Sequence, residues 1–420
     1  MIKLIKDKKI FSWALYDWAN STFATTVMVA FFPIFFKKYW ASNLSAVDST
    51  FYLGSINSFS SLILVIFAPL LGSFADLKTK RKVLLFSFCM LGCLSTVALF
   101  FVQENQWQIA LLFFFLANFG FAGGNIFYDS LITFVSTKKL MDKVSAFGFA
   151  LGYLGGGVLL VVNVLMITFP SSFGLADKVM ATKYSFLTVG VWWAVFSIPV
   201  FLYVKEYSLP ISNNASKPIS VFANLKSTFL DIKKSKYILT FLLAYWLYID
   251  AVDTIIKMSV DYGMALGIDS NGIIKALLLV QFIGFPAAIF FGWLGSKIGA
   301  KKGINITLIV YLFATIGAMF MSSITHFFML AAAIGLVQGG VQSLSRSLFA
   351  KIIPYGKSAE YFSFYNMMGK SAAIIGPLLV GLSVKLTNSS RVGMVPILLM
   401  LIVGFILLQK VKFEASINKT

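Results

Sequence analysis

The chain has 420 residues, of which 59% are hydrophobic and 12% charged, and its mean hydropathy is +0.86. Soluble proteins carry roughly 25% charged residues, so this composition excludes a soluble enzyme, a disordered protein and a disulfide scaffold. The net charge of +19 would indicate nucleic-acid binding in a soluble protein. Here we expect no nucleic-acid partner, because Lys and Arg collect in the cytoplasmic loops of membrane proteins.

Twelve apolar runs are long enough to cross a membrane, which takes about 20 residues each. They predict an all-α integral membrane fold with two six-helix halves, residues 1–204 and 238–420, and a cytoplasmic linker at 205–237. The spans are expected at about 11–36, 51–75, 83–102, 108–134, 144–169, 184–204, 238–262, 272–294, 303–322, 326–349, 361–385 and 392–409.

The Lys and Arg residues between these spans are unevenly distributed. The two termini and the loops after the even-numbered spans hold 25 of the 35, the other loops hold 6, and 4 lie inside spans. Cytoplasmic loops are enriched in basic residues, so we expect both termini in the cytoplasm and the basic loops against anionic lipids. Short loops favour a bacterial cytoplasmic (inner) membrane.

The linker between the halves contains a second type of pattern. Phe222, Leu225, Phe229 and Ile232 recur at helical spacing with Lys on the opposite side. This pattern predicts an amphipathic helix that lies on the cytoplasmic membrane surface. A mobile linker is the alternative.

The end of the second span carries a glycine, an acid and a basic cluster. The run is Gly72-Ser-Phe-Ala-Asp76-Leu-Lys-Thr-Lys80-Arg81. Gly72 permits close helix approach, and Asp76 is placed to cap a neighbouring helix or to pair with Arg81. We therefore predict a gating motif formed by Gly72, Asp76, Lys80 and Arg81.

This run resembles the loop 2–3 signature of the major facilitator superfamily, and a weaker copy follows span 8. The copy has Gly292, but Ser296 replaces the acid. The first span, with Trp13, Asp17 and Asn20, resembles the bacterial "unknown major facilitator" family, which is similar to the autophagy-related vacuolar amino-acid effluxers of fungi. The resemblance implies the major facilitator fold, small-solute transport with amino acids as the leading class, and a monomer.

Ionisable and amide side chains inside spans are costly and normally face a partner or a wet cavity. In the superfamily that the chain resembles, spans 1, 4, 7 and 10 line the central cavity. The candidate substrate-binding and coupling residues are Asp17 and Asn20 in span 1, Asn125 and Asp129 in span 4, Asp250, Asp253 and Lys257 in span 7, Gln338, Gln342 and Arg346 in span 10, and Lys370 in span 11.

These residues suit a zwitterionic solute, and we expect a secondary active transporter that works by alternating access. Arg346 or Lys370 would hold a carboxylate, and Asp250 or Asp253 an ammonium group. Coupling to protons needs a group that loads and unloads, and a buried carboxylate is expected in this role: Asp129 or Asp250. Asp17 lies near the cytoplasmic boundary and is a candidate for the gate instead of the binding site.

Other interpretations of the same residues stay open. A buried Asp253–Lys257 pair would also serve only to lock the bundle. An exporter of drugs or other metabolites, a solute-sensing membrane receptor, a channel and a lipid-modifying enzyme are the competing functions. We expect no enzyme activity, no cofactor and no metal.

Overall fold

The computed structural model of the chain describes residues 2–207, 220–265, 270–354, 356–387, 389 and 391–411. Every regular element in these ranges is a helix. The first half contains α1 (Ile2–Lys6), α2 (Lys8–Thr22), η1 (Phe23–Phe31), α3 (Phe32–Phe35), η2 (Phe36–Trp40), α4 (Ala46–Lys78), α5 (Arg81–Ala98), η3 (Leu99–Phe101), α6 (Trp107–Val135), α7 (Met141–Thr168), η4 (Pro170–Phe173) and α8 (Lys178–Tyr203). After the linker helix α9 (Val221–Lys234) follow α10 (Lys236–Ala265), α11 (Ser270–Ile298), α12 (Ala300–Met319), α13 (Ile324–Ile352), α14 (Ser358–Thr387) and α15 (Met394–Lys410).

The expected twelve spans are present. Eleven of the described helical segments are long and apolar enough to cross a membrane, and α15, with 17 residues, is a shorter apolar helix at the position of the twelfth. Most helices run several residues beyond the apolar runs, because helical hydrogen bonding continues into the polar boundary until a capping residue or a turn ends it.

Side-chain caps fix where several helices begin. Ser45, Asp177, Ser220 and Ser323 each precede a helix and accept a hydrogen bond from the backbone N–H three residues later, at 2.7 to 3.2 Å. Such a bond satisfies one of the N–H groups that a helix start leaves without a partner. The linker helix α9 therefore has a side-chain cap, Ser220, at its start.

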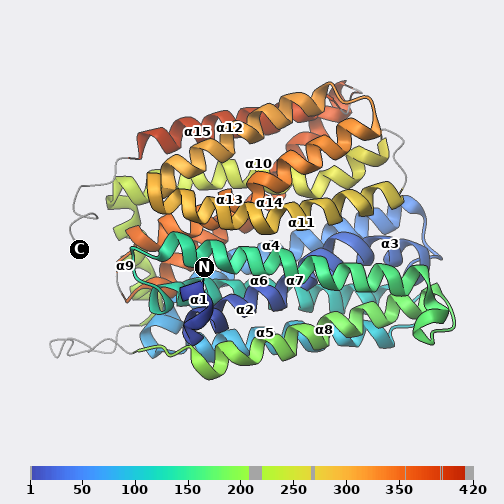
Figure 1. Ribbon diagram of the computed structural model, residues 1–420, viewed down its shortest axis with the longest axis horizontal. Helices are drawn as coiled ribbons and strands as arrows, with labels where there is room; N and C mark the ends of the chain where they lie inside the picture. Colours follow the sequence, from blue (N-terminus) through green and yellow to red (C-terminus); the bar gives the residue numbers. More distant parts are fainter. Residues whose placement is uncertain are drawn as a thin grey trace.

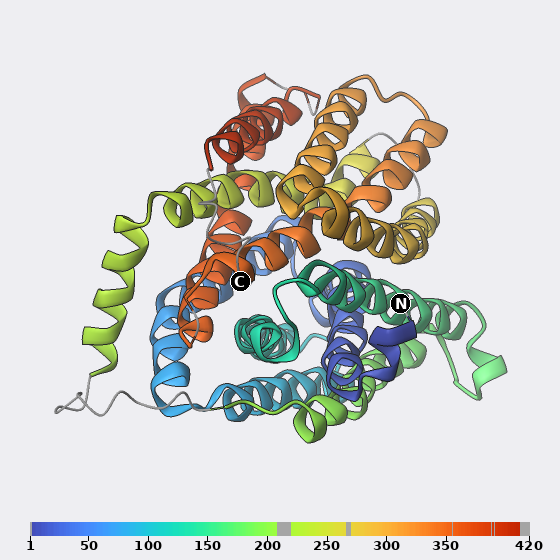
Figure 2. The same cartoon turned by 60° about the vertical axis from the view of Figure 1, so that its left-hand side comes forward.

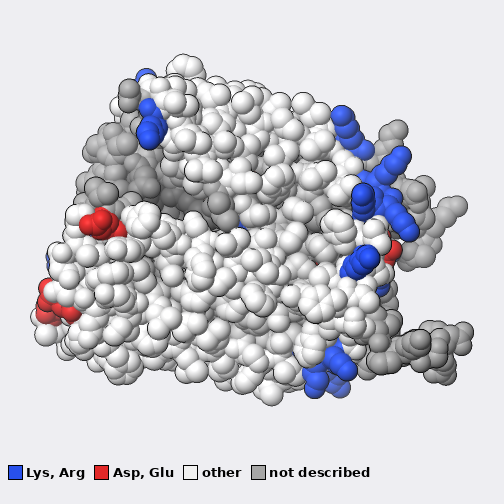
Figure 3. All heavy atoms as spheres, turned by 180° about the vertical axis from the view of Figure 1, so that it is seen from behind, with Lys and Arg blue, Asp and Glu red and all other residues white. Residues whose placement is uncertain are grey.

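The long helices lie side by side, with α9 and the end of α15 at one end of the molecule, which we call the α9 end (Figure 1). A turned view separates the helices of residues 2–204 from those of residues 236–411 (Figure 2). The two halves meet along two seams, where α4 packs on α14 and α7 packs on α11. Lys and Arg gather at the α9 end, and the wide band between the ends is almost uncharged on the face that Figure 3 shows.

The first span changes its helical geometry in the middle. Residues Phe23–Phe31 and Phe36–Trp40 form wider, π-type turns, with Pro33 between them. Such turns often mark functional segments, because they displace the backbone and its side chains from the regular helical positions. Ala24 and Thr25 in the first of these runs line the cavity described below.

Candidate functional site

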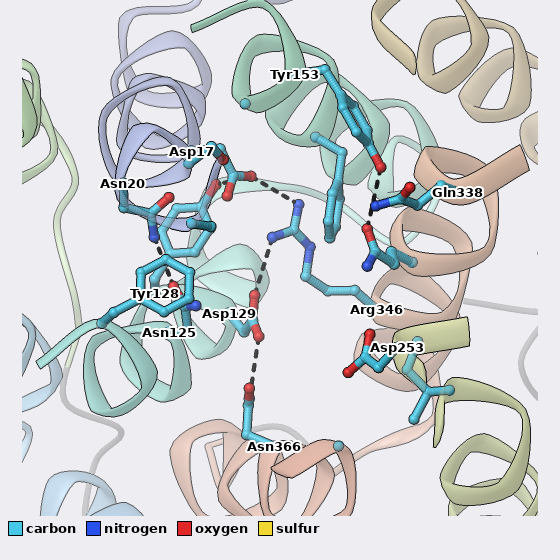
Figure 4. Close-up of a pocket in the computed structure, with 18 of the residues that line it drawn as sticks. Asp17, Asn20, Asn125, Tyr128, Asp129, Tyr153, Asp253, Gln338, Arg346 and Asn366 are labelled. Carbon is cyan, nitrogen blue, oxygen red and sulfur yellow. Dashed lines mark hydrogen bonds and ion pairs between the residues drawn. The ribbon is translucent and has the colours of Figure 1, made fainter. Parts of the chain in front are cut away.

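A cavity of about 300 Å³ lies between the two halves. Its wall is built by α2, η1, α6 and α7 of the first half and by α10, α11, α13 and α14 of the second (Figure 4). The polar and aromatic lining residues are Asp17, Asn20, Ser21, Thr25, Phe121, Asn125, Tyr128, Asp129, Phe149, Tyr153, Tyr245, Asp253, Gln281, Gln338, Gln342, Arg346, Tyr365, Asn366 and Lys370. This size and lining suit a small polar solute.

Most of the predicted site residues come together in this wall. Nine of the eleven line the cavity, namely Asp17, Asn20, Asn125, Asp129, Asp253, Gln338, Gln342, Arg346 and Lys370. The side chain of Lys257 lies outside the described part of the structure. Among the described residues, no group of three or more His, Cys, Asp or Glu side chains is placed to hold a metal ion.

Asp250 lies behind the wall, contrary to the expectation that it faces the solute. Its side chain is buried, and its Oδ1 accepts hydrogen bonds from the backbone N–H of Gly376 at 3.0 Å and from the hydroxyl of Thr254 at 3.3 Å. These contacts join α10 to α14. Residues three apart on a helix differ by roughly 60° in direction, so Asp253 reaches the cavity while Asp250 points into the packing.

The guanidinium of Arg346 is the centre of the charged part of the wall. Nη1 donates to Asp129 Oδ1 at 3.1 Å, and Nη2 donates to Asp17 Oδ2 at 3.3 Å. Nε donates to the Ser145 hydroxyl and Nη2 to the Ser145 carbonyl, both at 2.9 Å. Arg346 comes from α13, whereas all three partners belong to the first half, so this buried cluster joins the two halves.

Further hydrogen bonds hold the two carboxylates in place. The Tyr128 hydroxyl donates to Asp17 Oδ2 at 2.7 Å, and the Asn366 amide donates to Asp129 Oδ2 at 3.2 Å. Trp13 in turn donates from its indole N–H to the Tyr128 carbonyl and stacks on the Tyr128 ring. Both acids are therefore oriented by neighbours before any solute arrives.

Amide and hydroxyl groups continue the wall away from this cluster. The Asn20 amide donates to Asn125 Oδ1 at 2.8 Å, which joins α2 to α6. Across the two halves, the Tyr153 hydroxyl donates to Gln342 Oε1 at 3.4 Å. The wall thus carries neutral hydrogen-bonding groups beside the charged ones.

Sequence reasoning missed the uncharged neighbours of the Arg346 cluster, which are Ser145, Tyr128 and Phe149, whose ring centroid lies 4.3 Å from the guanidinium carbon. Ser145, Phe149 and Tyr128 are ordinary residues in apolar helices, and nothing in their residue type marks them as different from packing residues. The spacing of Ser145 and Phe149, which places them on one face of α7 beside Gly148, is the one available signal.

The predicted gating motif makes contacts at the α4–α14 seam. Asp76 forms an ion pair with Arg81, and its two carboxylate oxygens accept from the backbone N–H groups of Ala359 and Glu360 at 3.2 and 2.8 Å. These N–H groups belong to the first turn of α14, where a negative charge is favoured. Gly72 lies against Ala359, so a side chain at this position would collide with the α14 backbone. Lys80 immediately precedes α5 and is exposed.

The linker helix is joined to the same seam. The Asn224 amide donates to Ser73 Oγ in α4 at 3.0 Å and to both oxygens of Glu360 in α14 at 3.1 Å. Lys357 reaches Asp231 at 3.3 Å, although both side chains are partly exposed. One face of α9 therefore contacts both halves at the α9 end, while Phe222 on the same helix is exposed.

A third polar contact lies at the other seam. Asp142, in the first turn of α7, accepts from the Ser347 hydroxyl at 2.7 Å and from the Lys351 ammonium at 2.6 Å. Nearby, the Ser145 hydroxyl donates to the Ser343 carbonyl at 2.7 Å. Together with the Asp76 contacts, these bonds hold the halves together at the α9 end.

Comparisons with known proteins place this arrangement in context. A family model described as "Vacuole effluxer Atg22 like" matches residues 44–420. An "Uncharacterized MFS-type transporter", YxiO of Bacillus subtilis (strain 168), is 36% identical over 407 residues, which are 96% of this chain and 95% of the relative. Autophagy-related protein 22 of Eremothecium gossypii is 22% identical over 449 residues, covering 92% of this chain and 87% of the relative.

The fold has solved counterparts as well. The crystal structure of the human organic anion transporter MFSD10 superposes with a TM-score of 0.74 over 96% of this chain and 99% of that one. The two sequences are 14% identical, so this likeness concerns the fold.

Proposed function

Since the chain belongs to the vacuole effluxer Atg22-like family and has the fold of major facilitator superfamily transporters, we propose that it is a secondary active transporter for a small zwitterionic solute, with amino acids as the favoured class. The chain is a multi-pass integral membrane protein with two six-helix halves. In the proposed cycle the halves open alternately toward the two sides of the membrane.

The observation that carries this proposal is the position of the Arg346 cluster. Asp17, Asp129 and Arg346 line the cavity and also form the ion pairs between the halves. A solute in the cavity therefore meets the groups that hold the α9 end closed. A solute changes the free energy of opening only if it interacts differently with the closed and the open state. Because the same residues line the cavity and join the halves, a solute bound to them meets different partners in the two states.

The second half supplies the charges that we assign to the solute's backbone groups. Lys370 carries a positive charge and lines the cavity, so we assign the solute carboxylate to it. Asp253 on α10 is the proposed partner of the ammonium group. Both residues line the cavity.

The charge distribution supports an orientation for this cycle. Basic side chains gather at the α9 end, as Figure 3 shows, and basic loops favour the cytoplasmic side of a membrane. We therefore assign the α9 end to the cytoplasm, and the membrane to the cytoplasmic membrane of a bacterium. In this assignment the structure is closed toward the cytoplasm by the contacts of Asp76, Asp142 and Arg346.

Protons are the proposed coupling ion. The Arg346 cluster contains two carboxylates and one guanidinium, so one proton on a carboxylate balances its formal charge. Asp129 is the proposed carrier, because Asn366 of the other half also contacts it. Asp250 is the weaker candidate, since it lies behind the cavity wall.

Solute counterflow in vesicles tests this function. Purified protein is reconstituted, loaded with unlabelled solutes and exposed to a labelled pool of amino acids and dipeptides. We expect pH-dependent enrichment of at least one amino acid, and in D129N exchange that no longer depends on pH, because an amide at this position cannot take up a proton while Asp17 and Arg346 stay balanced. Exchange in D129N that keeps its pH dependence would contradict this role of Asp129. Glu104→Gln, an exposed change in the loop before α6, is the matched control.

The outcomes separate the competing functions. Exchange that survives D129N but loses its pH dependence keeps the carrier and places Asp129 in proton coupling. Solute binding without exchange in folded protein supports a receptor and contradicts the transport proposal. Enrichment of drugs or sugars in place of amino acids contradicts the proposed substrate class.

A further inference from the structure

The first half surrounds the Arg346 side chain as a receptor surrounds a ligand. Its guanidinium lies over the rings of Phe149, Trp13 and Tyr128, with 4.3, 4.8 and 5.4 Å between the guanidinium carbon and the ring centroids. Asp17 and Asp129 accept from its edge. These five residues come from α2, α6 and α7, and we call them the guanidinium receptor.

The receptor is shaped for a flat cation. A guanidinium offers two aromatic-facing surfaces and a ring of five N–H donors in one plane, whereas an ammonium is compact and donates in three directions. Aromatic faces above the plane and carboxylates around its edge match the first geometry. Cation–π contacts with rings within about 6 Å add to the binding when the cation is removed from water.

One glycine shows how tightly the receptor fits. A Cβ at Gly148 would lie 2.5 Å from Asp17 Oδ2 and 3.1 Å from Nη2 of Arg346. Real Cβ atoms essentially never approach another atom to the first distance, so a side chain at this position would displace the Asp17 carboxylate from its place beside Arg346. The glycine at position 148 of α7 therefore leaves the space that the guanidinium and its ion pair occupy.

Movement of the halves would empty this receptor. Arg346 belongs to α13 in the second half, whereas the receptor belongs to the first, so separation at the α9 end withdraws the arginine. Among the described cavity-lining residues, the first half then presents two carboxylates and no Lys or Arg. Two neighbouring carboxylates repel each other, and a cation from solution relieves that repulsion.

We propose that the receptor takes the guanidinium group of a transported solute, of which arginine is the simplest amino-acid example, when the α9 end is open. Arg346 then acts as the resident occupant that the solute replaces in each cycle. This inference rests on the proposed alternating-access function and names its substrate class. The zwitterionic end of the solute lies toward Lys370 and Asp253 of the second half, in line with the assignment above.

Chemical complementation tests the receptor without any transport measurement. Arg346→Ala leaves the receptor empty, and the purified variant is heated with millimolar methylguanidinium or arginine, far below denaturing concentrations. We expect the unfolding temperature to rise by roughly 2 to 4 °C, since a ligand of the folded state stabilises it. Methylurea and citrulline, the neutral counterparts of the same shape, should produce no rise, and lysine should produce a smaller one.

The wild-type protein and a double variant serve as controls. The wild-type protein, whose receptor Arg346 fills, should show a much smaller rise. Arg346→Ala combined with Asp129→Asn should lose the rise, because half of the carboxylate edge is gone. Equal stabilisation by methylguanidinium and methylurea, or an equal rise in the double variant, would overturn the inference.

A second measurement covers the case in which Arg346→Ala does not fold. Wild-type counterflow is then compared for arginine and citrulline, and exchange of arginine at least tenfold faster is expected. If other amino acids exchange and arginine does not, the transport function stands and this inference fails. If methylguanidinium stabilises Arg346→Ala but nothing exchanges, the receptor stands and the transport proposal fails.

Discussion

The two seams at the α9 end are closed by the same chemistry from different positions in the chain. At the α4–α14 seam the acid is Asp76, inside the Gly72 motif, and it contacts the first turn of α14. At the α7–α11 seam the corresponding motif position is Ser296, whose hydroxyl donates only to its own helix, to the Trp293 carbonyl, among the contacts described. There the acid is Asp142 on α7, and it reaches α13 instead.

The difference shows that a motif copy need not keep the role of the original. The Gly292 end of the copy still packs closely on Ala146, so the close approach of the helices is retained while the acid is not. The acid comes from the first half at both seams. In these acid contacts the carboxylates come from one half and the donors from the other, so the two seams do not use equivalent motifs.

The largest effect is expected from Asp76→Asn. The change removes the carboxylate that accepts from two N–H groups of α14 across the seam. Hydrogen bonds to charged groups contribute about 1.5 to 3 kcal/mol, which corresponds to a roughly 100-fold increase in opening. Opening is read at the other seam, as the rate at which a maleimide labels Ala146→Cys, whose parent side chain is 1% exposed. Asp48→Asn, at the exposed start of α4, should leave the rate unchanged.

A smaller effect is expected from Asp142→Asn, because Lys351 is partly exposed and its charge is partly screened. We expect a cost of about 1 to 2 kcal/mol and labelling about tenfold faster, read on Ser363→Cys in the α4–α14 seam. Ser363 is fully buried beside Gly72. An effect as large as that of Asp76→Asn would show that the seams contribute equally.

The smallest effect is expected from Ser296→Asp, which restores the acid to the copy. Ser296 is only partly buried, and the donors of α13 are already bonded to Asp142. The labelling rate of Ser363→Cys should change by less than about twofold, within the 0.5 kcal/mol typical of surface changes. A tenfold slower rate would mean that the missing acid limits closure.

The sequence predicts the spans well, because an apolar run of about 20 residues has few other ways to be buried. Polar residues inside spans indicate α2, α6, α10, α13 and α14 as helices of the cavity wall, because such residues need a wet or polar neighbour, but α7 and α11 also line the cavity and were not expected there. What the sequence does not predict is the partner of each charge. Arg346 is separated from Asp17 by 329 positions and from Asp129 by 217, and no local spacing connects them.

The misplaced Asp250 illustrates a second limit. The i, i+3 spacing of Asp250 and Asp253 identifies a common side of α10, but a helix side is wide enough to touch both a cavity and a neighbouring helix. Which of the two faces the cavity depends on the rotation of α10 against α14, where Gly376 admits the Asp250 carboxylate. That rotation is determined by helix packing, and the spacing of the two residues does not predict it.

The acids of the ion pairs that join the halves all come from the first half, and this affects which halves can associate. In the ion pairs that join the halves, Asp17, Asp129 and Asp142 come from the first half, and Arg346 and Lys351 from the second. Two copies of the first half would bring carboxylates against carboxylates, and two copies of the second would bring cations against cations. Like-charge contacts disfavour wrong partners, so the same residues that close the α9 end also disfavour contact between two copies of the same half.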